Sequence, residues 1–211
     1  MEKENYYLKY LVEIETIKKE IENKKKKPTL LLQACCGPCS TTVLKELLPY
    51  FDITIYYYNP NIYPVDEYEK RYEQFGKIPD VTNIIKCDYN EIEFYEKIRD
   101  IKDYDTLKEG GERCRACYEL RLEKTCKYAK EHNFDYFSTT LSISPYKNST
   151  WINEIGVELM NKYDIKFLYS NFKKKDGYKK SIQYSREYDL YRQEYCGCVY
   201  SLEEMRSNLS K

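Results

Sequence analysis

Short apolar or β-branched runs alternate with amphipathic segments along most of this chain, and this alternation constrains its fold more than any other feature. The composition of strands is found at residues 29–32, 52–58, 81–86, 136–140 and 165–169. Helical periodicity marks the segments between them, at residues 40–48, 64–75, 91–101, 114–131 and 148–163. Strands that alternate with helices predict an α/β fold, with a mostly parallel sheet and helices on both faces.

Further helices are expected at both ends of the chain. Residues 4–26 are charged, their apolar positions recur at helical spacing, and Pro28 follows them as a helix breaker. Residues 178–188 and 201–209 are also expected to be helical. We therefore divide the chain into an N-terminal helical extension, residues 1–28, and a single domain, residues 29–211, which is long enough to form a full core.

Composition and charge exclude several classes of protein. No stretch approaches the roughly 20 apolar residues of a membrane span. The charged start of the chain lacks the apolar segment of a signal peptide, so we expect a cytoplasmic protein with no membrane contact. Lys and Arg number 35, as do Asp and Glu, so the net charge predicts no polyanionic partner. Basic clusters at 24–27, 173–175 and 179–180 could still contact one locally, although such runs are typically solvated surface.

Nine cysteines are the strongest chemical feature of the sequence. In a reducing cytosol, clustered cysteines more often bind metal or perform redox chemistry than form disulfides, and an odd number also disfavours a closed disulfide set. Seven of the nine fall into three groups: Cys35, Cys36 and Cys39; Cys114 and Cys117; Cys196 and Cys198. Thiolates are the usual ligands of zinc and of iron–sulfur clusters.

Three interpretations of these thiols remain open: a closed four-cysteine zinc site, a thiol-exchange centre, and a larger metal assembly. One zinc or one [4Fe–4S] cluster uses at most four protein ligands, so seven thiols favour more than one metal, or one metal with reactive thiols beside it. Cys87 and Cys126 stand apart, and we expect them to be small buried hydrophobic residues. We expect His132, at a helix end, to be a C-terminal cap rather than a ligand.

The first cysteine group lies where an α/β fold binds its ligands. In such sheets ligands sit at the carboxyl ends of strands, near the point where the strand order reverses. The loop 35–39 follows the first strand, where a nucleotide-binding fold would place a phosphate loop. Thiols stand here in place of the glycines of such a loop, which disfavours phosphate binding.

Five segments, in order along the chain, resemble the motifs of the QueH family of epoxyqueuosine reductases. They are LLLQACCGPCS at 30–40, NPNIYP at 59–64 with Glu67, Tyr68 and Arg71 after it, RCRACY at 113–118 with Arg121 and Leu122, TTLSISPY at 139–146, and LYRQEYCGC at 190–198. The resemblance runs from about residue 29 to 202 and leaves the N-terminal helix outside. The family often has histidine where Gln33 and Tyr63 stand, so metal ligation here is expected to rest on thiolates, with help from a carboxylate.

The resemblance implies a fold related to the adenine-nucleotide alpha-hydrolase-like (Rossmann-like) domains and a QueH-like catalytic domain over residues 29–211. It also implies a [4Fe–4S] cluster with an additional iron ion, served by an unidentified electron donor. The expected reaction is reduction of epoxyqueuosine, at the wobble position of tRNA, to queuosine. The expected metal ligands are Cys35, Cys36, Cys39, Cys114, Cys117, Cys196 and Cys198.

Converting an epoxide to an alkene requires two electrons and two protons and releases the oxygen as water. An iron beside the cluster could act as a Lewis acid on that oxygen. Glu112, Tyr191 or a metal-bound water is the candidate proton donor. For Glu112 and Tyr191 the alternative is ordinary surface exposure or packing.

A modified base must leave its stack to reach the metals. We expect Tyr63, Tyr68 and Tyr191 to stack on it, although core packing is the alternative for each of these rings. We expect Arg71, Arg113 and Arg192 to contact phosphates. The expected substrate-binding residues are Asn59, Asn61, Tyr63, Tyr68, Arg71, Arg113 and Arg192.

Two rival functions follow from the same sequence. An ATP-dependent tRNA thiolase of related fold would carry a pyrophosphate loop rich in glycine and serine after the first strand, where this chain has Cys-Cys-Gly-Pro-Cys. A non-catalytic zinc-binding RNA adaptor would be colourless and contain zinc alone.

Overall fold

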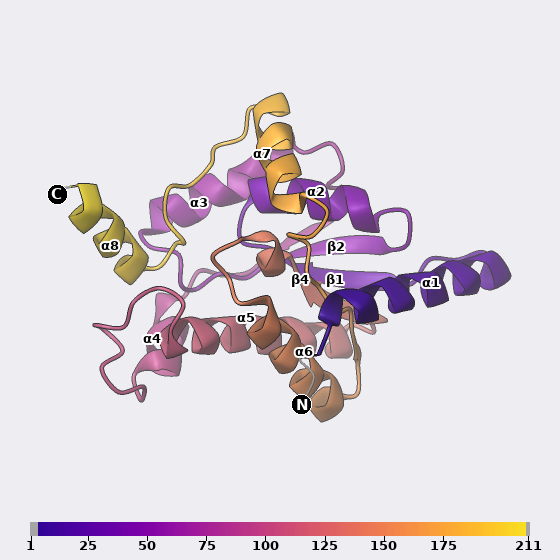
Figure 1. Ribbon diagram of the computed structural model, residues 1–211, viewed down its shortest axis with the longest axis horizontal. Coiled ribbons are helices and arrows are strands. Elements are labelled where there is room, and N and C mark those ends of the chain that lie inside the picture. Colours follow the sequence, from indigo (N-terminus) through magenta and orange to yellow (C-terminus); the bar gives the residue numbers. More distant parts are fainter. Residues whose placement is uncertain (1–3, 210–211) are drawn as a thin grey trace.

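The computed structural model describes residues 4–209 and contains one sheet of five strands in the order β3-β2-β1-β4-β5 (Figure 1). The strands are β1 (Thr29–Gln33), β2 (Asp52–Tyr57), β3 (Ile84–Lys86), β4 (Tyr136–Thr139) and β5 (Lys166–Phe167). Every neighbouring pair is parallel. The α/β class is therefore confirmed, and the sheet is wholly parallel and Rossmann-like.

All of the helices expected from sequence periodicity are present. They are α1 (Tyr6–Lys24), α2 (Gly37–Leu47), α3 (Val65–Glu73), α4 (Glu91–Ile98), α5 (Glu112–Glu131), α6 (Ser149–Tyr163), α7 (Gly177–Glu187) and α8 (Val199–Leu209). Two 3-10 turns, η1 (Gln74–Lys77) and η2 (Thr140–Ile143), follow α3 and β4. The expected strands 81–86 and 165–169 are shorter in the structure, because β3 and β5 are edge strands that pair on one side only.

Helices cover both faces of the sheet because its central strand carries apolar side chains on both faces. Leu30 and Leu32 of β1 join one buried cluster, and Leu31, between them, joins the other. Helices α1, α2 and α3 contribute to the first cluster, and α7 lies along α2 on the same side (Figure 1). Helices α5 and α6 cover the opposite face, and α4 packs against α5.

Helix α1 belongs to the main core although it precedes the first strand. Its side chains Tyr10, Ile14 and Ile17 are buried in the cluster that also contains Leu30 and Leu32. The hydroxyl of Tyr136 donates to Glu13 Oε1 at 2.7 Å, which ties the helix to β4. A boundary at residue 28 stays a prediction, and residues 1–3 and 210–211 of the two predicted segments lie outside the described residues.

The strand order reverses between β1 and β4. From β1 the chain proceeds outward through β2 and β3, then returns to place β4 on the other side of β1. Gln33 joins the carboxyl ends of three strands: its Nε2 donates to Tyr58 O at 3.2 Å, and its Oε1 accepts from Thr139 Oγ1 at 2.7 Å. The loops after β1 and β4 therefore meet at the position where such folds bind ligands. Among the described helices, none combines the length and the apolar character needed to cross a bilayer.

Candidate metal centre

The loop after β1 holds three thiols close together. The Sγ atoms of Cys35, Cys36 and Cys39 all lie within 4.8 Å of one another. Cys36 is extended, and Gly37 begins α2 with Pro38 in its first turn, where a missing backbone N–H costs nothing. The helix therefore starts directly behind Cys36, and its first turn carries Cys39 close to Cys35. In the described part of the chain, no other three potential ligands are this close.

Four further thiols form a second, wider group. Cys114 and Cys117 lie one turn apart near the start of α5, on the same face of the helix. Cys196 lies in the loop between α7 and α8, and Cys198 directly precedes α8. Burial raises the pKa of Cys117 to about 12, and the neighbouring thiols Cys196, Cys198 and Cys114 add to this shift. The C-x-x-C and C-x-C motifs, distant in the sequence, thus meet in space.

Two cations connect the two groups of thiols. Burial alone would lower the pKa of Lys147, but the nearby sulfurs of Cys196 and Cys35 outweigh it, so the pKa is raised and the ammonium stays charged. Arg121 is buried, its Nε donates to Cys117 O at 3.2 Å, and the thiols Cys117 and Cys35 raise its pKa against the effect of burial. Each cation therefore interacts with sulfurs from both groups, so all three sequence clusters converge on one site.

The protonation of these thiols depends on what surrounds them. Hydrogen bonds from Cys36 and Cys39 lower the pKa of Cys35, and donating that bond raises the pKa of Cys36 to about 12. Burial raises the pKa of Cys196 to about 11. Without an added positive charge most of these thiols are therefore neutral at pH 7. A metal cation supplies such a charge and deprotonates the thiols that bind it.

The donor set fits thiolate-bound metal. The three groups of cysteines converge, and α2, α5 and α8 each begin within two residues of one of these cysteines, so the positive ends of three helices lie near the thiols. The compact group of Cys35, Cys36 and Cys39 suits a single ion. The wider group suits a cluster, because each cysteine of a cubane binds a different iron and the sulfurs must stand apart.

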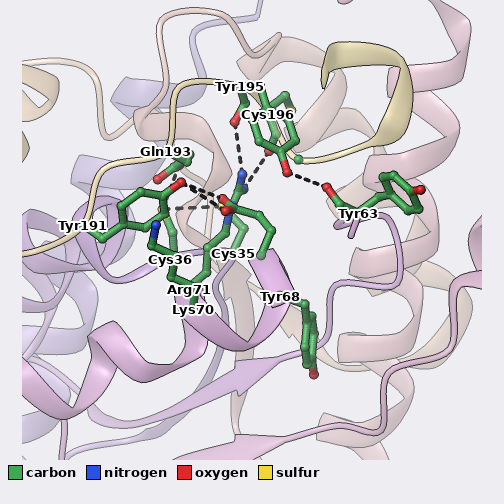
Figure 2. Close-up of polar contacts among 12 residues, drawn as sticks. Cys35, Cys36, Tyr63, Tyr68, Lys70, Arg71, Tyr191, Gln193, Tyr195 and Cys196 are labelled. Atoms are coloured by element: carbon green, nitrogen blue, oxygen red, sulfur yellow. Dashed lines mark hydrogen bonds and ion pairs between the residues drawn. The ribbon is translucent and has the colours of Figure 1, made fainter. Parts of the chain in front are cut away.

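A buried arginine holds the Cys196 loop against α3 (Figure 2). Arg71 has no exposed surface, and its Nε donates to Glu67 Oε1 at 2.7 Å. Its other two nitrogens donate to the carbonyl oxygens of Cys196, at 2.9 Å, and of Tyr195, at 3.2 Å. The hydroxyl of Tyr191 donates to the same carboxylate of Glu67 at 3.0 Å. The position of Cys196 is therefore fixed by hydrogen bonds to its main chain.

Gly197 is required in this loop by both conformation and space. Its φ is +138°, which residues with a Cβ rarely adopt. A Cβ would come within 3.0 Å of Arg71 Nη1 and 3.2 Å of Ile62 Cγ1. The carbonyl of Gly197 accepts from Tyr63 N at 2.8 Å, and the Tyr195 hydroxyl donates to Tyr63 O. The loop is thus also joined to the 59–64 segment.

A pocket of about 260 Å³ opens beside the thiols. Its lining includes Cys39, Lys147, Tyr178, Arg192, Gln193 and Cys196. Gln193 Nε2 donates to Cys36 Sγ at 3.2 Å, and Tyr146, which is 75% exposed, stands at the mouth. The pocket gives a small molecule or an extruded base access to the cysteines.

Several residues expected to bind substrate are instead buried. Arg71 is occupied by Glu67 and the Cys196 loop, and Arg113 is 2% exposed with its guanidinium over the Tyr200 ring and a bond to Tyr104 O. Tyr68 is 1% exposed and points away from the cysteines in Figure 2. None of these three side chains offers surface to a phosphate or a base, so the structure corrects their expected role to a structural one.

The asparagines of the 59–64 segment are buried as well. Asn59 Nδ2 donates to Ala34 O at 2.8 Å, and its Oδ1 accepts from Gln33 Nε2 at 3.0 Å. This fully engaged side chain holds the loop after β2 and does not present itself to substrate. Asn61 is buried beside Gly197, and its Oδ1 has no hydrogen-bond partner within the described residues.

The remaining candidates differ in their access to the pocket. Arg192 lines it, although its guanidinium also donates to Ser181 O at 3.1 Å. Tyr63 is 40% exposed and points outward. Tyr191 bonds Glu67, and burial with this bond raises its pKa to about 12. Glu112 is exposed and faces a different hollow, beside Trp151 of α6, so the structure does not bring it to the thiols.

The two isolated cysteines and the histidine lie outside the metal centre. Cys126 is fully buried, with its Sγ 3.8 Å from Leu159 O, as expected for a small core residue. Cys87 is half-buried and contacts the Tyr56 hydroxyl. His132 caps the C-terminus of α5 and stacks on Tyr128 with 4.0 Å between ring centroids, which confirms its predicted role.

Lys147 is the most important residue that sequence reasoning missed. It directly follows the TTLSISPY segment, whose position after β4 places it at the reversal of strand order. Tyr178 and Gln193 were also missed as pocket residues. A lysine immediately beyond the carboxyl end of a central strand was the available indication for Lys147, since that end of the sheet binds ligands.

Comparison with known proteins agrees with this geometry. Residues 30–204 match the family model described as epoxyqueuosine reductase QueH. The chain is 42% identical over 188 residues to epoxyqueuosine reductase QueH of Streptococcus pyogenes serotype M1, covering 85% of this chain and 72% of that one. It is 43% identical to the protein of the same name from Staphylococcus epidermidis, covering 85% and 79%. For the Thermotoga maritima protein the identity is 39%, covering 84% and 92%.

Proposed function

Because this chain belongs to the epoxyqueuosine reductase QueH family, we propose that its seven convergent cysteines form the metal centre with which it reduces epoxyqueuosine in tRNA to queuosine. The chain is an oxidoreductase of queuosine biosynthesis. The observation that carries the proposed site is the convergence of three separate cysteine motifs at the reversal of strand order, beside a pocket.

The two groups of thiols are assigned to two metals. Cys114, Cys117, Cys196 and Cys198 would hold a [4Fe–4S] cluster, and Cys35, Cys36 and Cys39 would hold the additional iron. When bound, the cluster supplies electrons singly and the separate iron offers a Lewis acid, while an external donor provides the two electrons that the epoxide needs. The two protons leave with the epoxide oxygen as water.

The chain's own side chains supply charge and shape. Arg71, Arg121 and Lys147 place positive charge around the thiolates and limit the cost of burying them. Lys147 also lines the pocket, so its Nζ can donate a hydrogen bond to the oxygen that leaves the substrate. Tyr146 and Tyr178, at the mouth and wall of the pocket, are positioned to pack against an extruded base.

Replacing Lys147 with Met is expected to lower kcat by about tenfold to a hundredfold, because a hydrogen bond to developing negative charge is worth roughly 1.5–3 kcal/mol. The Lys147→Arg variant keeps the charge and should recover part of the rate. Because Lys147 also balances the charge of the thiolates, kcat is expressed per bound cluster, with iron measured on the same samples. A Met variant with a normal kcat per bound cluster would contradict this role.

The reaction itself is tested with anaerobic, fully metallated protein and tRNA that carries epoxyqueuosine. With dithionite as the reductant, and without cobalamin or ATP, we expect queuosine, detected by nucleoside mass spectrometry as the loss of one oxygen. Failure with several reductants would count against the function. ATP-dependent incorporation of sulfur would favour the thiolase, and zinc without sulfide would favour the RNA adaptor.

A further inference from the structure

A strip of lysines leads away from the metal pocket. It starts at Lys147, whose carbonyl accepts a hydrogen bond from Lys173 Nζ at 2.9 Å. Lys174 and Lys175 follow directly, and Lys180 lies on the first turns of α7. Tyr178 of α7 lines the metal pocket, whereas Lys180 of the same helix lines a second groove, so α7 joins the two hollows.

The second groove is large and basic. It has a volume of about 640 Å³ and is lined by residues of α1, α2 and α7, and Figure 1 shows α7 lying over α2. Five lysines and two glutamates line it. Two of these lysines are already paired, Lys18 with Glu15, and Lys45 with Asp80 at 3.1 Å. Within residues 4–209, the lining lysines without an acidic partner are Lys174, Lys175 and Lys180.

Positive charge is concentrated along this strip. Partial burial lowers the pKa of Lys173, and the like charges of Lys174 and Lys147 lower it further. Helix α7 begins here without an acidic residue in its first turn, and the carboxylate of its N-cap, Asp176, makes no capping bond but pairs with Lys179 at 3.1 Å. The positive end of the helix dipole therefore adds to the lysine charges.

We propose that this basic strip, Lys173, Lys174, Lys175 and Lys180, binds the sugar–phosphate backbone of the substrate tRNA beside the nucleotide that enters the pocket. The proposal rests on the function above. A chain of uniform negative charge is the ligand that suits unpaired lysines along a groove, because each contact releases a condensed counterion. The continuity of the strip with Lys147 and Tyr178 places such a backbone next to the base that reacts.

The test compares two double charge reversals with equal change in net charge. One combines Lys174→Glu with Lys180→Glu in the strip. The control combines Lys19→Glu with Lys102→Glu, two exposed lysines that do not line this groove and lie outside the basic clusters. Binding to an unmodified tRNA transcript is measured by fluorescence anisotropy over a range of salt, and turnover of epoxyqueuosine-containing tRNA is measured with dithionite.

The strip variant is expected to raise both Kd and KM about tenfold at ~0.15 M salt, while kcat stays unchanged. The slope of log Kd against log salt should fall by about two. Unchanged Kd and slope, or equal effects in the control pair, would overturn the proposal. The strip variant could instead bind tRNA normally and turn over slowly only when a ferredoxin replaces dithionite. That result would assign the strip to an electron-donor protein, and it would also overturn the proposal. If the strip variant bound tRNA more weakly as expected, but the unmodified protein never reduced epoxyqueuosine, only the proposed function would be refuted.

Discussion

Substitution of Cys117 by Ala is expected to abolish reductase activity and to remove about four of about five iron atoms per chain. Cys117 is buried among Cys114, Cys196 and Cys198, and both its helix and its main-chain carbonyl are fixed, the latter by Arg121. The four cysteines of this group would all be ligands, so no spare thiol within the group could replace the one that is removed. Iron and sulfide analysis, with the absorption spectrum, would follow the loss directly.

Two matched variants make this result specific. Cys36→Ala is expected to abolish activity while removing about one iron, because Cys36 belongs to the compact group. Cys126→Ala removes an equally buried thiol elsewhere on α5, and should keep all iron and cost on the order of 1 kcal/mol or less in stability. Loss of the cluster in the Cys126 variant, or its retention in the Cys117 variant, would show that the ligands are assigned wrongly.

Substitution of Arg71 by Met is expected to destabilise the protein by about 3–5 kcal/mol, since it leaves the buried carboxylate of Glu67 without its cation. The carbonyls of Cys196 and Tyr195 lose their donors at the same time. For a chain of this size the melting temperature should fall by about 2–4 °C per kcal/mol, which calorimetry on the metallated protein would measure. Iron content should also fall, because the Cys196 loop is no longer held.

The control for Arg71 is Arg99→Met. Arg99 is exposed, 3.8 Å from Asp100, and such a surface pair contributes at most about 1 kcal/mol. Adding Glu67→Gln to Arg71→Met should restore part of the stability, because it removes the unpaired charge. A normal melting temperature in Arg71→Met, or no recovery in the double variant, would refute this structural role of Arg71.

The fold class, the helices and the position of the first cysteine loop followed from local features of the sequence. Strand composition, helical periodicity and caps such as Asn148, which accepts from Thr150 N and Trp151 N before α6, act over a few residues and can be read from them. The thiols after β1 had to lie at the carboxyl edge of a parallel sheet, because every strand of such a sheet ends on the same side.

Only the tertiary structure decided which side chains face the pocket and which support it. Arg71 and Cys196 are 125 residues apart in the sequence, yet the guanidinium of Arg71 donates a hydrogen bond to the carbonyl of Cys196. The expected phosphate-binding and stacking roles of Arg71, Arg113 and Tyr68 failed for this reason: burial depends on contacts between elements distant in the chain, and no local pattern encodes it. The same holds for Lys147, which is an ordinary lysine in the sequence. Its ammonium lies between the two groups of thiols only because β4 packs beside β1 and α7 beside α2.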